Sequence, residues 1–331
     1  MKKLSSEKGI ALLLVLWTLT ILMVIVLSFS FAIKAETLAT LSFKEGIEKR
    51  FLAEAGIERG IMELFYRIVN KGQTVILEGR EVWTVDGTPY TGKTSGGSYT
   101  VAIFDESGKL NINKMNDSNA IIFKNLLKNT GVPEKDVDGI TDSVLDWKDP
   151  NKGMHRLNGA GDDYYASLPN PYEPKHADFD TLEELLLVKG MTPEILYGTG
   201  EKKGIADLIS VMPATTPQIN INAAPKDLLL AVPDMTPEIV EAIVSLRQVK
   251  DILNVAEIPG LNAQTMNLYL TVAGGTTFSV EALGYKEDEK TGYAARATLT
   301  IEGNNKFKYL SYKSPARMSS GARKEAQKQE S

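Results

Sequence analysis

The longest uninterrupted apolar stretch of the chain lies near its amino terminus. Ile10 to Ile33 is a run of 24 residues without a charged side chain. As a helix this run would measure about 36 Å, which exceeds the roughly 30 Å thickness of a bilayer's hydrocarbon core. Lys2, Lys3 and Lys8 precede the run, and positive charge favours the cytoplasmic side of a membrane. The pattern predicts a single transmembrane helix over 10–33, with the rest of the chain exported.

Beyond the span, apolar residues recur at spacings near 3 to 4, 7 and 10, which predicts that the helix continues over 34–70. Alternating patterns then predict strands within 71–113, one of them over 81–85, and again within 273–312. Mostly helical patterns fill 114–272 between them. The sequence therefore predicts an α+β fold, in which a long amino-terminal helix packs on an antiparallel sheet and a large α-helical domain is inserted in that sheet. The tail, 313–331, has five Lys or Arg against two Asp or Glu and is predicted to be disordered.

Composition narrows the chemistry that the chain can carry. Its 331 residues are 43% hydrophobic and include no Cys. Disulfides, thiolate catalysis and Cys-ligated zinc are therefore excluded. Only two His are present, His155 and His176, so a multi-His metal site is excluded as well; we expect His155 in a surface loop and assign His176 no chemistry. The net charge of −5 and a pI near 5.4 argue against nucleic-acid binding by the chain as a whole.

One segment matches a nucleotide-binding motif by letter only. Gly87 to Thr94 reads G-x-x-x-x-G-K-T, as in a phosphate-binding loop. That motif needs a helix to begin at its Lys, here Lys93, so that backbone N–H groups face the phosphates. Gly96 and Gly97 follow instead, and a strand after them. We interpret the segment as a hairpin loop and predict no nucleotide-binding residues.

Two similar segments indicate an internal repeat. Residues 185–195 and 228–239 each read as a helix, a tight turn, a Thr N-cap and a Pro at the first position of a second helix. A looser third copy is 255–261. These segments resemble helix–hairpin–helix units, whose best-known use is to hold DNA phosphates with backbone amides. Their surroundings are acidic, so the favoured interpretation is a helical scaffold that presents a protein-binding surface.

A long loop between the predicted helices is rich in carboxylates. Its Asp and Asn side chains offer hard oxygen ligands of the kind that Ca²⁺ prefers. The plainer interpretation is a solvated turn cluster, because Asp is a common turn and cap residue and the loop has no EF-hand spacing. On spacing alone both remain open. The Asp and Asn side chains of this region include Asp146, Asp149, Asn151, Asp162 and Asp163.

The basic leader, residues 1–9, meets the apolar run directly at Lys8-Gly9-Ile10. This junction resembles the cleavage site of prepilin peptidase, and the resemblance implies cleavage after Gly9 and N-methylation of Ile10. The span would then remain in the mature protein. A plain single-span anchor is an alternative, and a cleaved secretory signal is a weaker one because no A-x-A motif follows. Most pilins carry Glu at the fifth mature position, where this chain has Leu14.

Together these features resemble the minor pseudopilin K family of the type II secretion system, also called the general secretion pathway protein K family. The missing Glu at Leu14, the Asp-Trp-x-Asp at 146–149, the Gly-Ala and Tyr-Tyr pairs at 159–160 and 164–165, the inserted domain and the hairpin units all contribute. The resemblance implies a pilin-like fold. It also implies calcium at the acidic loop, with Asp149, Asn151, Asp162 and Asp163 as ligands and Asp146 as an additional candidate, although the family usually has an acidic residue where Gly161 stands.

The same resemblance implies a structural, non-enzymatic function. A tip subunit would assemble with the minor pseudopilins I and J and initiate the pseudopilus. Its further partners would be prepilin peptidase and the inner-membrane assembly platform. It would be anchored in the bacterial inner membrane with its carboxyl-terminal domain in the periplasm. No set of nucleophile, base and orienting group appears in the sequence, so no catalytic residue is predicted.

Three alternatives remain. The chain could be a tip-type minor pilin of a type IV pilus, a membrane-anchored DNA-uptake protein that uses its hairpin units, or a calcium-dependent hydrolase. Salt-dependent DNA binding distinguishes the second, and an activity lost on replacing Asp162 and Asp163 distinguishes the third.

Overall fold

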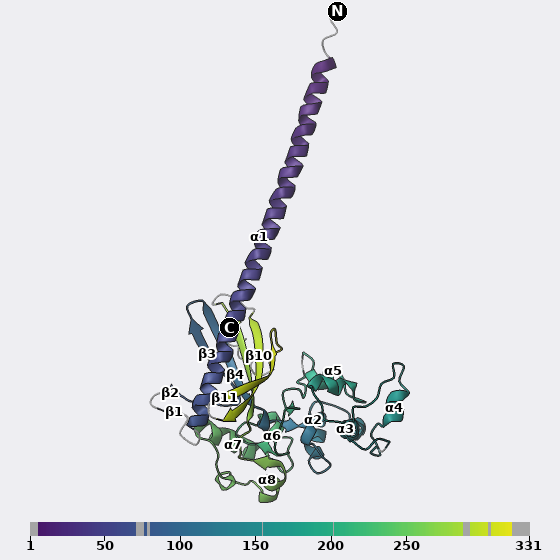
Figure 1. Cartoon of the computed structure of the whole chain (residues 1–331), viewed down its shortest axis with the longest axis vertical. Coiled ribbons are helices and arrows are strands. Elements are labelled where there is room, and N and C mark those ends of the chain that lie inside the picture. Colours follow the sequence, from purple (N-terminus) through teal and green to yellow (C-terminus); the bar gives the residue numbers. More distant parts are fainter. Residues whose placement is uncertain are drawn as a thin grey trace, which may run out of the picture.

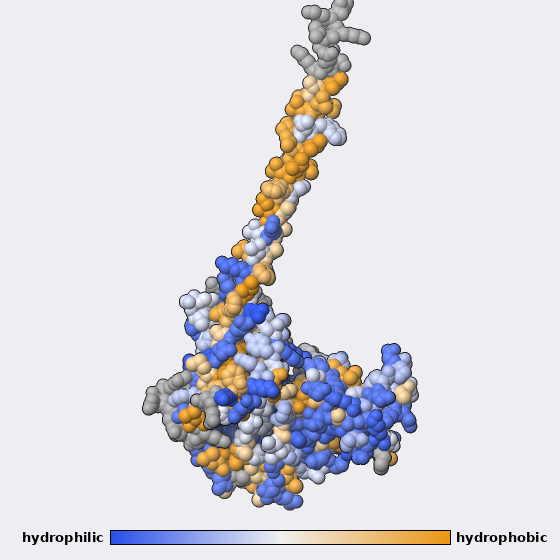
Figure 2. All heavy atoms as spheres, viewed as in Figure 1, coloured by the Kyte–Doolittle hydropathy of each residue, from blue (hydrophilic) through white to orange (hydrophobic). Residues whose placement is uncertain are grey.

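The computed structural model describes residues 6–70, 76–77, 80–153, 155–200, 202–286, 292–303 and 306–319. Its main feature is one helix, α1 (Ser6–Val69), of 64 residues, which is roughly 96 Å long. The first part of α1 projects from the rest of the molecule as a stalk (Figure 1). Large apolar side chains from Ile10 to Ile33 are exposed all round this stalk, and Figure 2 shows hydrophobic colour over most of it. Within the described residues, α1 is the one helix long and apolar enough to cross a membrane.

The second part of α1 packs on a five-stranded antiparallel sheet. The strand order is β11-β10-β9-β4-β3. Side chains spaced by three and four residues along α1, from Ala53 through Ile57 and Ile61 to Leu64, are buried against it. The strands are β3 (Asp86–Thr94), β4 (Gly97–Asp105), β9 (Thr277–Tyr285), β10 (Tyr293–Gly303) and β11 (Lys306–Lys313), with a separate two-residue pair, β1 (Ile76–Leu77) and β2 (Arg80–Glu81).

Between β4 and β9 the chain forms a helical domain with its own hydrophobic core. This core includes Phe123, Trp147 and Tyr165 and is separate from the core under α1. The domain contains η1 (Glu106–Gly108), β5 (Leu110–Asn111), η2 (Ile112–Lys114), α2 (Ala120–Asn129), α3 (Glu134–Trp147), α4 (Asp162–Ala166), η3 (Leu182–Leu187), α5 (Pro193–Tyr197), β6 (Ile209–Ser210), β7 (Ile219–Asn220), α6 (Lys226–Leu229), α7 (Pro237–Val249), η4 (Val255–Glu257), α8 (Ala263–Tyr269) and β8 (Leu270–Thr271). The pairs β5–β6 and β7–β8 are parallel.

This architecture confirms the predicted fold class, but three boundaries differ from the predictions. The first part of the sheet ends at Asp105 rather than at residue 113, because Leu110 and Asn111 pair with β6 inside the inserted domain. The strand after β2 begins at Asp86, not at residue 81. Trp83 instead turns back and stacks on Tyr90 of β3, with ring centroids 4.6 Å apart.

The third difference concerns the carboxyl end. Lys313 is the last residue of β11. Beyond it, Ser314 forms a hydrogen bond with Tyr293, and Ser319 forms two with Glu281. The prediction of disorder from residue 313 onward is therefore wrong for this part of the tail. The charge composition of the tail gave the wrong prediction, because these hydrogen bonds depend on single residues elsewhere in the chain. Residues 320–331 lie outside the described residues.

Three glycines allow the close approach of α1 to the sheet. A Cβ at Gly60 would lie 2.6 Å from Val280 Cγ1, and one at Gly56 would lie 2.9 Å from Ala282 Cβ. On the strand side, a Cβ at Gly284 of β9 would lie 2.2 Å from the carbonyl oxygen of Lys49. Helix and strand backbones thus meet where side chains are absent, as expected for glycines that pack α1 closely on a sheet.

We predict opposite effects for the same substitution at two glycines of α1. Gly60→Ala should lower the free energy of unfolding by about 1–3 kcal/mol, because the added methyl group overpacks against Val280. Gly46→Ala should raise it by up to about 1 kcal/mol, because nothing lies within 4 Å and Ala favours the helix. Urea unfolding of the chain in detergent micelles, followed by circular dichroism, measures both. Equal effects would contradict the packing role of Gly60.

Candidate functional site

The predicted processing site lies within the first helix. In the full chain α1 begins at Ser6 and runs through Gly9 and Ile10 without interruption. The Ile10 and Leu14 side chains are both exposed on the stalk. A helix with an aliphatic side chain at position 14 offers no carboxylate to a neighbouring helix there. Cleavage after Gly9 remains a prediction.

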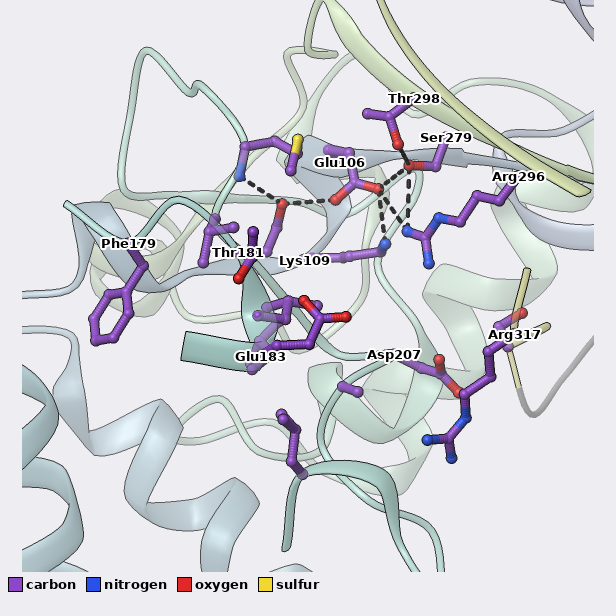
Figure 3. Close-up of a pocket in the computed structure, with 18 of the residues that line it drawn as sticks. Glu106, Lys109, Phe179, Thr181, Glu183, Asp207, Ser279, Arg296, Thr298 and Arg317 are labelled. Carbon is purple, nitrogen blue, oxygen red and sulfur yellow. Dashed lines mark hydrogen bonds and ion pairs between the residues drawn. The ribbon is translucent and has the colours of Figure 1, made fainter. Parts of the chain in front are cut away.

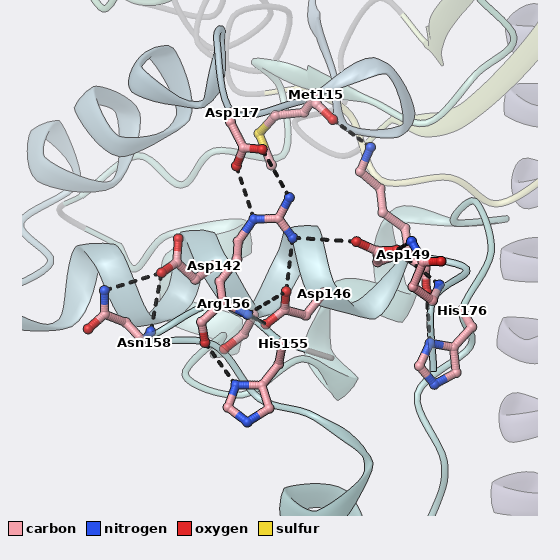
Figure 4. Close-up of polar contacts among 12 residues, drawn as sticks. Met115, Asp117, Asp142, Asp146, Asp149, His155, Arg156, Asn158 and His176 are labelled. Atoms are coloured by element: carbon pink, nitrogen blue, oxygen red, sulfur yellow. Dashed lines mark hydrogen bonds and ion pairs between the residues drawn. The ribbon is translucent and has the colours of Figure 1, made fainter. Parts of the chain in front are cut away.

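The acidic loop is organised by an arginine. Asp146, in the last turn of α3, is almost fully buried and accepts hydrogen bonds from Arg156, through Nη1 at 2.9 Å and through the backbone N–H at 3.1 Å to each oxygen. On its other side the same guanidinium donates to Asp117, at 3.0 and 3.2 Å, and lies 3.8 Å from Asp149. Figure 4 shows Arg156 between Asp117 and Asp146. Its hydrogen bond lowers the pKa of the Asp117 carboxyl group.

His176 contacts two further candidate ligands, Asp149 and Asp162. His176 Nε2 lies 2.7 Å from Asp162 Oδ1, and its Nδ1 lies 2.8 Å from the carbonyl oxygen of Asp149. Asp149 Oδ1 also accepts from the backbone N–H and the Nδ2 of Asn151, and the backbone bond contributes most to lowering the pKa of Asp149. Asp163 is exposed beside Asp162 at the start of α4.

Sequence reasoning missed the role of His176, to which it assigned no chemistry. The residue is 14 positions from Asp162 and 27 from Asp149, so no spacing rule connects them. His155, in contrast, is exposed in the loop, as expected.

The five candidate ligands do not surround one common point. Asp146 is a poor candidate for a metal ligand, because both its oxygens accept from Arg156 and the positive guanidinium takes the place of a cation. Among the described residues, no group of three or more Asp, Glu or His is arranged to hold a metal ion. Asp149 and Asp162 remain near each other only through the imidazole of His176. The five-residue set therefore does not fit a calcium ion in this arrangement.

The three predicted hairpin units are present and similar in structure. Each turn contains a residue with positive φ: Gly190 at 82°, Asp234 at 62° and Gly260 at 78°. A side-chain cap begins the second helix of each unit, with Thr192, Thr236 and Asn262 accepting from backbone N–H groups of α5, α7 and α8.

The hairpin turns do not present the basic surface that DNA binding needs. In the first turn, Lys189 bends back so that its Nζ lies 3.3 Å from the carbonyl oxygen of Gly159 and 4.9 Å from the Tyr164 ring centroid. In the second turn, Asp234 accepts from Thr265 Oγ1 at 3.1 Å and so joins the second unit to the third. These contacts favour a scaffold over a phosphate-binding surface.

The segment that matches a phosphate-binding loop is a strand. Gly87 to Thr94 belongs to β3, which pairs with β4 at the edge of the sheet. The prediction of a hairpin loop was wrong for these residues, because Pro89 and the glycines are tolerated on an edge strand. The turn is limited to Ser95 and Gly96. No helix begins at Lys93, so these residues lack the helix N-terminus that a phosphate-binding loop needs.

The junction between the sheet and the inserted domain contains several buried polar side chains, among them Asp105, Glu106 and Asn220. Asp105, the last residue of β4, accepts from Ser107 through one oxygen and from Asn220 Nδ2 and the Gly275 N–H, each at 3.1 Å, through the other. Its carboxylate thus joins the start, the middle and the end of the insertion. Burial raises the pKa of Asp105.

Glu106 forms a second polar centre beside it (Figure 3). Oε1 accepts from Lys109 Nζ at 2.8 Å and Ser279 Oγ at 2.6 Å, and Oε2 accepts from Ser210 Oγ at 2.6 Å. Burial by itself would raise the pKa of Glu106, but the charges of Lys109 and Arg296 outweigh it and hold the pKa at about 2. Since Ser210 belongs to the inserted domain and Ser279 to β9, the ionised carboxylate connects the two domains.

Two ion pairs extend this junction along the base of the sheet. Arg247 of α7 lies 3.2 Å from Asp86 of β3, and Arg67 near the end of α1 pairs with Asp251. Buried pairs of this kind fix an orientation more reliably than they add stability. Above the junction the two domains diverge around a cleft of about 1090 Å³.

These features define the class of protein: a pilin-like protein with an apolar amino-terminal stalk and a helical domain inserted in its sheet. A family model described as type II secretion system (T2SS), protein K matches residues 108–198, which include the acidic loop and the first hairpin. Curated proteins named type II secretion system protein K are also similar to the chain.

Named relatives show how far the similarity extends. Protein K of Pseudomonas aeruginosa is 28% identical over 173 residues, which cover 50% of this chain and 49% of that protein. Protein K of Pectobacterium carotovorum is 30% identical over 152 residues, or 42% of this chain and 44% of that one. The aligned segments therefore span about half the length of these two relatives.

A solved structure shares the fold. It is a chain of the crystal structure of the GspK–GspI–GspJ complex from the enterotoxigenic Escherichia coli type 2 secretion system. The match has a TM-score of 0.57 and 16% identity, and it covers 85% of this chain and all of that one. At this identity the match supports the arrangement of helix, sheet and insertion.

Proposed function

We propose that the chain is a structural subunit at the tip of the type II secretion pseudopilus, where it helps to initiate the filament, and that it is not an enzyme. The observation that carries this proposal is the division of α1 into two parts. The first part is uncovered and apolar, whereas the second is built into the sheet. A helix of this kind anchors a folded domain in the inner membrane, with that domain in the periplasm.

The position of the inserted domain supports a tip location. In Figure 1 the insertion extends to the side of the sheet and beyond the end of α1 that is far from the stalk. A domain in that position obstructs stacking of a further subunit on the same axis. Leu14 supports the same location, because a subunit without a carboxylate there lacks a partner for the terminal amine of a neighbour above it.

The proposed partners are the other minor pseudopilins, of the I and J types. The crystal structure with the similar fold is that of a complex of GspK with GspI and GspJ. In this chain, Phe51 and Met62 on α1 are 63% and 62% exposed although they lie within the folded part of the molecule. Large apolar side chains in such positions are typical of protein contact surfaces.

We predict that the chain forms a complex with I-type and J-type pseudopilins through this surface. Phe51→Glu and Met62→Glu should each weaken assembly by about 10- to 100-fold, because burying an apolar side chain contributes about 1.5–3 kcal/mol. Leu157→Glu is the matched control, since Leu157 is 95% exposed in the acidic loop, away from α1. Size-exclusion chromatography and affinity measurements with the purified partners test this. A chain that stays monomeric with both partners would refute the proposed function.

We further propose that calcium binds at the acidic loop through Asp149, Asn151, Asp162 and Asp163. The support is the chemistry around His176, whose ring nitrogens contact a carbonyl oxygen of Asp149 and a carboxylate oxygen of Asp162. Both are donors of the kind that Ca²⁺ prefers. Binding at this position requires the imidazole to move aside, and Asp146 stays with Arg156.

Calcium should therefore stabilise the chain, by about 2.7 kcal/mol at a concentration 100-fold above the Kd. Asp162→Asn should abolish the effect, whereas Asp138→Asn, a change in an exposed ion pair of α3, should preserve it. Calorimetric titration and thermal unfolding in metal-free buffer with added Ca²⁺ measure both. No heat and no shift in Tm at millimolar Ca²⁺ would contradict the calcium site. The negative charge of the acidic side chains would then be balanced by Arg156 and His176 without a metal ion.

A further inference from the structure

We infer that the segment Ser314–Ser319 is a latch that holds the inserted helical domain at a fixed angle to the sheet. The segment follows β11 and runs along the cleft between the two domains, where its residues 316–319 form part of the lining. The inference concerns the chain alone and does not depend on its partners.

The latch is bound to the sheet at both of its ends. Near its start, Ser314 Oγ lies 3.0 Å from Tyr293 Oη, and the Ala316 N–H donates to the carbonyl oxygen of Ala294 at 2.9 Å. At its end, the N–H and Oγ of Ser319 both donate to Glu281 Oε2, at 2.9 and 2.8 Å. Ser319 and Glu281 are buried, so these last two bonds are shielded from water and from competition by it.

Between these anchors the latch reaches across to the inserted domain. Arg317 Nη2 donates to the carbonyl oxygen of Tyr197, the last residue of α5, at 2.9 Å. Its guanidinium carbon also lies 4.4 Å from the centroid of the Tyr197 ring, within the range of a cation–π contact. One arginine thus engages both the backbone and the side chain of Tyr197, and Figure 3 shows Arg317 beside the cleft.

The position of the Arg317–Tyr197 contact allows it to restrain the angle between the inserted domain and the sheet. Other interdomain contacts, at Asp105, Glu106 and the Arg247–Asp86 and Arg67–Asp251 pairs, lie at the junction where the chain crosses between domains. Contacts at a junction restrain rotation about it less than a contact that joins the domains away from it. Arg317 joins the domains across the cleft instead, and the weak Lys313–Glu183 pair, at 3.4 Å and exposed, adds little to it.

Distance measurements between spin labels test the latch directly. The chain has no Cys, so Lys135→Cys in α3 and Lys308→Cys in β11 provide the only two labelling sites. Both positions are exposed. The full chain in detergent micelles should give one narrow distance distribution. Arg317→Ala, or deletion of residues 315–331, should broaden it and add a second distance population.

Deletion of residues 320–331 alone is the matched control. It keeps every latch contact described above and should reproduce the distribution of the full chain. An unchanged distribution in Arg317→Ala would overturn the inference, as would broadening in the control, because the restraint would then lie elsewhere. If the longer deletion unfolds the chain, as judged by circular dichroism, Arg317→Ala decides the question by itself.

Discussion

The close contact between α1 and β9 is the constraint on which the rest of the structure depends. The strand approaches the helix until Gly284 lies against the backbone near Lys49, and Gly60 lies against Val280. This contact fixes which part of α1 belongs to the folded domain and which part projects from it. Since one rigid helix carries both parts, the position of the sheet relative to a membrane follows from the contact.

The inserted domain adds a second constraint, of a different physical kind. The sheet and α1 join through apolar packing, whereas the insertion meets the sheet through buried polar groups such as Asp105, Glu106 and Arg247. A closely packed apolar contact resists displacement because its side chains interdigitate, and paired buried charges lose much of their interaction when displaced. The chain therefore has an apolar contact that holds α1 on the sheet and a polar junction that orients the inserted domain.

Sequence patterns predicted the helix, the strands β9 to β11, the insertion and the hairpin units, because each of these depends on local periodicity or on caps such as Thr192 and Thr236. They failed where the structure depends on distant partners. The strand β3 contains Pro89 and two glycines and is formed only because β4 pairs with it. The partners of His176 and Arg317 lie far from them in the sequence, so neither contact leaves a spacing signal.

The central claim is that the apolar helix stays in the mature protein as the stalk of a pilin-like subunit. The most direct measurement is the mass and amino-terminal residue of the protein produced together with a prepilin peptidase. The account predicts a chain that has lost residues 1–9 and begins at N-methylated Ile10. A chain that retains Met1 to Gly9 under those conditions would be a plain single-span anchor and would contradict the account.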